Sequence, residues 1–148
     1  MLATRLVRLI EAHSDQLATT LTEKIRTSQR TLDYLKIPPE ELRQQSYEIY
    51  AHLGEWLLTK TESEIEHHYI SIGQHRSEEG IRISDFVWAL VITKENLVHY
   101  LQTNATVDGA MQLLGELELM QLVEQFFDRA LYYGTVGYER ARKATKAA

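Results

Sequence analysis

QHRSEEGIRISDFVWALVITKENLVHYL, residues 74–101, is the segment that decides the fold we expect of this chain. A charged helix end meets Gly80, a residue that readily takes the left-handed conformation found just after many helices. Ser84 and Asp85 follow, a pair suited to cap and begin a second helix. Residues 86–92 are then apolar for two turns, which predicts a core helix contacted from several sides.

Helical patterns continue on both sides of this segment. The 148 residues contain only two prolines, at positions 38 and 39, and seven glycines, which is too little punctuation for a many-stranded sheet. Periodicity predicts further helices over residues 2–32 with a break at Ser14, from Pro39 to about Thr59, from about Thr61 to Gly80, and from about Asp108 to Lys146. We therefore predict one all-α domain over residues 1–148, a bundle of about five to six helices that ends in a long C-terminal helix.

The composition narrows the classes of function. A hydrophobic content of 44% is ample for one core, and the absence of cysteine excludes disulfides, thiolate zinc sites and thiol catalysis. No apolar run is long enough to cross a membrane, so we expect a soluble protein that resides in the cytoplasm and makes no membrane contact. Residues 40–79 hold nine acids against three bases, which disfavours nucleic acid as a partner.

The last ten residues, 139–148, reverse that charge. They form a basic helix end or linker that contains Arg140, Arg142, Lys143 and Lys146. Basic residues at this position stabilise the helix macrodipole, and contact with nucleic acid or lipid is the alternative interpretation.

The long helix is the second informative element. At about 1.5 Å per residue it would reach nearly 60 Å, longer than a compact domain of this size, so it must project or bend, with Gly134 and Gly137 the expected places for a bend. Two apolar stripes can be drawn on it. The first contains Leu113, Leu117, Met120, Phe127 and Leu131, and the second contains Leu119, Val123, Phe126, Ala130 and Tyr133. We predict that the first stripe forms the seam of a homodimer. The alternative is that both stripes are internal.

The chain has six histidines, so metal and haem sites are considered first. His68 and His75 of the cluster Glu64, His67, His68 and His75 lie about 10.5 Å apart along a helix, too far to share one ion, so we predict no metal site. His99 and His52 sit beside apolar residues, where each could ligate haem or simply pack with one ring nitrogen hydrogen-bonded; we predict no cofactor.

Catalysis finds no support in the pattern of residues. No serine has a nucleophile-elbow context, the acidic pairs resemble helix surface, and no glycine-rich phosphate loop is present, so we predict no catalytic residues and no enzyme activity. If the core holds a pocket, we expect Trp56, Trp88 and Val91 to line it. A protein that binds haem, a tetrapyrrole or a lipid there is the main alternative function.

Two blocks of sequence resemble a known family. RSEEGIRISDFVWALVITKENL, residues 76–97, and FFDRALYYGTVGYERA, residues 126–141, are similar to the N-terminal sensor domain of RsbT co-antagonist proteins of the RsbRD type. The resemblance implies a globin-like helical fold without haem, a bacterial stress-response role, a homodimer, and relay of a signal to a protein partner or a fused output domain. It brings no catalytic residues, and it leaves open whether this domain acts alone or as part of a longer chain.

Overall fold

The structure, a computed structural model, describes residues 2–104 and 110–147, and over these residues it consists of helices and their connections. The α-helices are α1 (Leu2–Ala12), α2 (Ser14–Thr27), α3 (Pro39–Ala51), α4 (Glu62–Glu78), α5 (Ile83–Asn104) and α6 (Ala110–Ala147). A 3₁₀ helix, η1 (Leu32–Lys36), and a π-helix, η2 (Glu55–Thr59), join them. The all-α prediction is confirmed, whereas the globin-like arrangement stays a prediction. None of the described helices combines the length and the apolar composition needed to cross a membrane.

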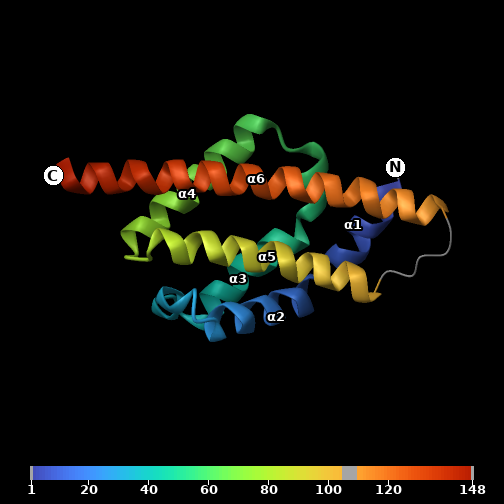
Figure 1. Cartoon of the computed structure of the whole chain (residues 1–148), viewed down its shortest axis with the longest axis horizontal. Helices are drawn as coiled ribbons and strands as arrows, with labels where there is room; N and C mark the ends of the chain where they lie inside the picture. Colours follow the sequence, from blue (N-terminus) through green and yellow to red (C-terminus); the bar gives the residue numbers. More distant parts are fainter. Residues whose placement is uncertain (1, 105–109, 148) are drawn as a thin grey trace.

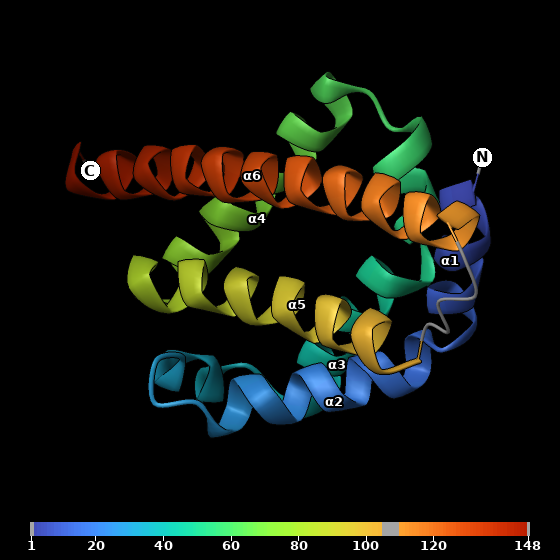
Figure 2. The same ribbon diagram turned by 45° about the vertical axis from the view of Figure 1, so that its right-hand side comes forward.

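The helices lie in layers along the length of α6 (Figure 1). Both views place α5 between α6 on one side and α2 on the other, and α1 lies near the beginning of α6 (Figure 2). The C-terminal end of α6 projects beyond the other helices. Its 38 residues form one uninterrupted helix of about 57 Å, so the projecting alternative is the correct one. The start expected at Asp108 lies outside the described residues.

Gly80 ends α4 as predicted. Its φ of +77° is the left-handed conformation, and two hydrogen bonds complete a Schellman motif, from Ile81 N–H to the Arg76 carbonyl at 3.1 Å and from Gly80 N–H to the Ser77 carbonyl at 3.1 Å. Ile81 is fully buried after this turn, so the motif aims the chain back into the core before α5 begins.

The cap expected at Ser84 was predicted wrongly, and Ser14 does not cap α2 either. The break near Ser14 is present, but Ser14 is the first helical residue of α2, and His13 precedes it without a side-chain cap. Ser84 likewise lies inside α5, which begins at Ile83. Helix α4 begins with a capping box, in which Thr61 and Glu64 satisfy each other's backbone N–H groups.

The expected helix from Pro39 to Thr59 is interrupted. Pro39 does open α3, but α3 stops at Ala51 and a π-turn follows from Glu55. The interruption lies where α1 crosses, because Gly54 N–H donates to Glu11 Oε2 at 3.0 Å and a side chain at Gly54 would press on Val7. A tertiary contact therefore takes a backbone donor from the helix, which the local pattern does not reveal.

The apolar run of α5 is central to the core, as predicted. Phe86, Ala89, Leu90 and Ile92 are buried, and they join a cluster that also contains residues of α1–α4 and α6. Asn96, which is buried on the same helix, donates from Nδ2 to the Leu17 carbonyl and the Tyr50 hydroxyl, both at 3.2 Å. This amide ties α2 and α3 to α5 with its hydrogen bonds satisfied, as burial requires.

Helices α4 and α6 approach each other backbone to backbone. A Cβ atom at Gly73 would lie 1.9 Å from the Gly134 carbonyl oxygen, and one at Gly137 would lie 2.0 Å from the Ile70 carbonyl oxygen. Glycine is the residue that permits so close a helix crossing. Gly134 and Gly137 therefore serve as contact points against α4, and the bend considered for them is absent.

A group of hydrogen bonds holds the turn between α4 and α5 against η1. Asp33 accepts from Arg82 N–H at 2.8 Å and from Arg82 Nε at 3.1 Å, while Asp85 Oδ2 accepts from Asp33 N–H at 3.0 Å. Lys36 Nζ donates to the Gly80 carbonyl at 2.7 Å. The hydrogen bond from Arg82 N–H, supported by the arginine side chain, lowers the pKa of Asp33.

Replacing Gly73 with alanine should destabilise the protein by about 2–3 kcal/mol, because the new methyl group forces α4 away from α6. Urea denaturation measures the free energy of unfolding. The control is Ser63→Ala at an exposed position of the same helix, which should change that free energy by less than about 0.5 kcal/mol. Equal stability of Gly73→Ala and wild type would contradict the backbone contact.

Asp33→Asn should reduce the acid sensitivity of the fold. Because the folded pKa of Asp33 is lowered, its ionisation contributes stability above the unfolded pKa of about 3.9, and that contribution is lost as the pH falls through the lower folded value. At about pH 7 the variant should therefore be less stable than wild type. When the pH is lowered from about 5 to 3, its stability should decrease less than that of wild type. Melting temperatures across this range test it, with the exposed Asp128→Asn as control, and parallel wild-type and Asp33→Asn curves would count against it.

Candidate functional site

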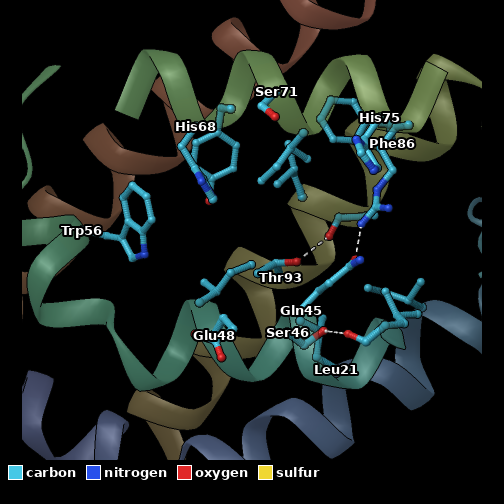
Figure 3. A pocket seen from close by; sticks show the side chains of 18 of the residues that line it. Leu21, Gln45, Ser46, Glu48, Trp56, His68, Ser71, His75, Phe86 and Thr93 are labelled. Atoms are coloured by element: carbon cyan, nitrogen blue, oxygen red, sulfur yellow. Dashed lines mark hydrogen bonds between the residues drawn. The ribbon is translucent and has the colours of Figure 1, made fainter. Parts of the chain in front are cut away.

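A cavity of about 530 Å³, partly open to solvent, is the candidate site. It lies between α3, α4 and α5, with η2 at one end and parts of α2 and η1 completing the wall (Figure 3). Its size falls within the range of about 300–1,000 Å³ that is usual for small-molecule sites.

The inner wall of the cavity is mostly apolar. It is formed by residues from five elements: Leu21, Ile25, Tyr34, Leu42, Ile49, Tyr69, Ile72, Phe86, Ala89 and Leu90. Two of the hydroxyl groups in the wall are turned back to their own helices, since Ser46 Oγ donates to the Leu42 carbonyl at 2.9 Å and Thr93 Oγ1 to the Ala89 carbonyl at 2.7 Å. Both side chains therefore offer the cavity little beyond their carbon atoms.

Arg76 is the exception in this wall. Its residue is only 8% exposed, its guanidinium lies 5.3 Å from the centre of the Tyr34 ring, and its Nη1 donates to Glu79 Oε1 at 2.7 Å. Nη2 donates to Gln45 Oε1, whereas Nε is buried and finds no hydrogen-bond partner among the described residues. Burial raises the pKa of Tyr34 to about 12, so its hydroxyl stays protonated beside the guanidinium.

Aromatic side chains surround the end of the cavity at η2. The Trp56 ring centroid lies 4.6 Å from that of His68, 6.1 Å from that of Tyr69 and 6.0 Å from that of Phe126. Partial burial, followed by the charges of Lys60 and His67, lowers the pKa of His68, so this ring favours its neutral form. Trp56 thereby attaches the π-turn to α4 and α6.

Charged groups at this rim are paired. Lys60 Nζ lies 3.3 Å from Glu64 Oε2, and His52 lies 3.3 Å from a Glu48 carboxylate oxygen and 3.9 Å from one of Glu55. The two cations that line the cavity, Lys60 and Arg76, thus each hold a carboxylate already.

The structure places only some of the expected pocket residues in the cavity. His52 and Trp56 line the cavity. Trp88 lies elsewhere, with the Arg30 guanidinium 4.4 Å from its ring centre, and Val91 is half-buried outside the cavity lining. His99, the other histidine considered as a haem ligand, is exposed and borders a separate surface hollow, because helix α5 turns this residue away from the core.

The acidic and histidine cluster of α4 is spread over the helix. Glu64 belongs to the capping box at Thr61, while His68 and His75 line the cavity and His67 is exposed. Within residues 2–104 and 110–147, no three His, Asp or Glu side chains are placed to hold a metal ion.

The two stripes predicted on α6 have different environments. Leu119, Val123, Phe126 and Ala130 of the second stripe face the core. Of the predicted seam, Leu113 and Leu117 are exposed, Leu117 by 58%, whereas Met120 and Leu131 are half-buried against the core. Phe127 is only 2% exposed, so its place in the seam is wrong, because it packs inside this chain. Leu114 and Tyr132, which the seam omitted, are exposed apolar residues of the same helix.

Several cavity residues were missed by sequence reasoning. Gln45, Ser46, Thr93 and Arg76 each read as ordinary helix-surface polar residues, and only the packing of α3, α4 and α5 brings them together. The one available signal was helical phase, since Gln45 and Ser46 lie between the apolar positions 42 and 49 of α3.

Comparison with known proteins gives a family. No curated protein and no solved structure matches the chain. The family model described as "Histidine kinase N terminal" matches residues 3–140, which includes the cavity and most of α6. The chain therefore belongs to the histidine kinase N-terminal family, a family of helical, sensor-type domains in signal transduction.

Proposed function

We propose that this chain is a non-catalytic, cytoplasmic sensor domain that passes a change in its cavity to α6, and from α6 to a signalling partner or a fused output domain. Membership of the histidine kinase N-terminal family supports a sensing role. The finer assignment to the RsbRD type, with a bacterial stress response, remains part of this proposal.

One observation carries the proposal: the cavity wall and the contact with α6 are the same part of α4. Ile72 and Arg76 line the cavity, and Gly73 between them touches the Gly134 backbone. Because closely packed backbones leave no slack, a shift of α4 caused by the cavity must move α6 or break the contact. On the α5 side, Phe86 lines the cavity and also lies where a Cβ atom at Gly134 would clash, at 2.6 Å.

Helix α6 is suited to carry such a shift outward. Its C-terminal end projects past the other helices and carries the basic residues Arg140, Arg142, Lys143 and Lys146. Leu113, Leu114, Leu117 and Tyr132 leave apolar surface exposed along its outer side. Exposed apolar patches of this kind are typical of protein interfaces, and we propose that a second copy covers this one to form a homodimer.

A haem, tetrapyrrole or lipid-binding sensor is the second candidate function, favoured by the cavity alone. Of the two proposed haem ligands, His99 borders another hollow and His52 faces carboxylates at the rim. An absorption spectrum of the purified protein separates the candidates, because a Soret band lost in His52→Ala would establish the haem-binding one.

Filling the cavity should alter α6. Ala89→Phe places a ring in the cavity, and we expect amide hydrogen exchange in residues 134–138 of α6 to change at least threefold, since those residues touch α4 and Phe86. Mass spectrometry of deuterated peptides measures this exchange. Trp88→Phe, at a tryptophan outside the cavity, is the control and should leave that segment unchanged; a change confined to α3, α4 and α5 in Ala89→Phe would refute the relay.

Leu114→Glu combined with Leu117→Glu should convert the dimer into a monomer, because two charges would be buried unpaired in the seam. Light scattering after size-exclusion chromatography gives the mass. Gln121→Glu at an exposed position of the same helix controls for added charge and should remain dimeric. A wild-type protein that is monomeric at about 100 μM would overturn the dimer.

A further inference from the structure

The cavity has an electrostatic character that selects its ligand. Its lining contains two cations, Lys60 and Arg76, and each is already paired with a carboxylate, Glu64 at 3.3 Å and Glu79 at 2.7 Å. Glu48 and Glu55 also border it; both lie near the His52 ring, and Glu48 Oε1 also accepts from Gln44 Nε2 at 2.9 Å, so neither carboxylate is paired with a lysine or an arginine. An anionic ligand would therefore meet no unpaired cation and two carboxylates, at a desolvation cost that a single hydrogen bond does not offset.

The polar groups of the cavity wall are mostly engaged in hydrogen bonds already. Ser46 and Thr93 have donated their hydroxyl hydrogens to backbone carbonyls, and Gln45 Oε1 is engaged by Arg76. Arg76 Nε–H has no partner among the described residues either, but the surrounding atoms shield it from the cavity, so a ligand does not reach it. The Tyr69 hydroxyl makes no hydrogen bond among the described residues and is a donor left in the inner wall.

The remaining surface is apolar and aromatic. Leu90, Ile72, Tyr69 and Phe86 form the inner wall, and Trp56 borders the cavity on the side of η2. Such a wall favours a hydrocarbon chain or ring, because transfer of apolar surface from water is the main favourable term.

We propose that the cavity binds an uncharged, largely apolar molecule with at most one hydrogen-bond acceptor, such as a ketone or an ester. This inference rests on the proposed sensing role of the cavity and names its ligand class. It distinguishes the neutral molecule from a carboxylate of the same length, which the paired charges of the wall disfavour.

Trp56 fluorescence provides the test, in a Trp88→Phe background that leaves Trp56 as the sole tryptophan. The protein is titrated with 2-decanone and, separately, with decanoate at about pH 8, where a carboxyl of ordinary pKa is ionised. We expect 2-decanone to bind at least tenfold more tightly than decanoate. Tighter binding of decanoate would overturn the proposal, as would the absence of binding by 2-decanone up to its solubility limit.

One variant locates the binding, and its Trp88→Phe parent is the reference. Ala89→Phe should abolish binding, and circular dichroism verifies that each variant is folded.

The experiments distinguish a wrong ligand class from a wrong relay. If neither 2-decanone nor decanoate binds but Ala89→Phe still alters exchange in α6, the ligand class is wrong and the sensor proposal stands. If 2-decanone binds and α6 does not respond to Ala89→Phe, the cavity is a binding site and the relay is wrong.

Discussion

The backbone contact between α4 and α6 is the constraint on which the rest of the structure depends. Gly73, Gly134 and Gly137 allow the two helices to touch without intervening side chains, and this contact brings the long helix against the wall of the cavity. Larger residues would separate the helices and leave space beside Phe86, whose ring meets the face of Gly134. Close packing of this kind transmits displacement because it tolerates few intermediate positions.

Helix α4 borders the cavity and also contacts α6, and it is held at both of its ends. The Thr61 capping box fixes its beginning and the Gly80 turn fixes its end, where Lys36, Asp33 and the Arg82 backbone hold the following residues. Between these fixed ends, residues 68–76 face the cavity on one side and α6 on the other. A helix held at both ends responds to a ligand mainly in its middle, where the glycines lie.

Local patterns in the sequence predicted those features that local energetics decide. Gly80, Pro39 and the apolar run of residues 86–92 each act through their own backbone or burial preference, and each appears where expected. The end of α3 at Ala51 could not be predicted, because it depends on the approach of Glu11 from α1. The same holds for Gly134 and Gly137, whose partners Gly73 and Ile70 lie more than sixty residues earlier, and for Phe127, whose side is set by how α6 is rotated against the core. Arg76 reads as a helix-end cation, and its place in the cavity wall, bound to Glu79 and Gln45, follows only from the neighbours that surround it.

The distance between α3 and the projecting end of α6 tests the central claim most directly. The chain has no native cysteine, so spin labels can be attached at Glu40→Cys and Arg142→Cys, both exposed positions. Double electron–electron resonance then compares the wild-type cavity with the filled cavity of Ala89→Phe. Coupling through Gly73 and Gly134 predicts that the distance distribution shifts when the cavity is filled. An unchanged distribution in a folded Ala89→Phe protein would show that α6 does not follow the cavity.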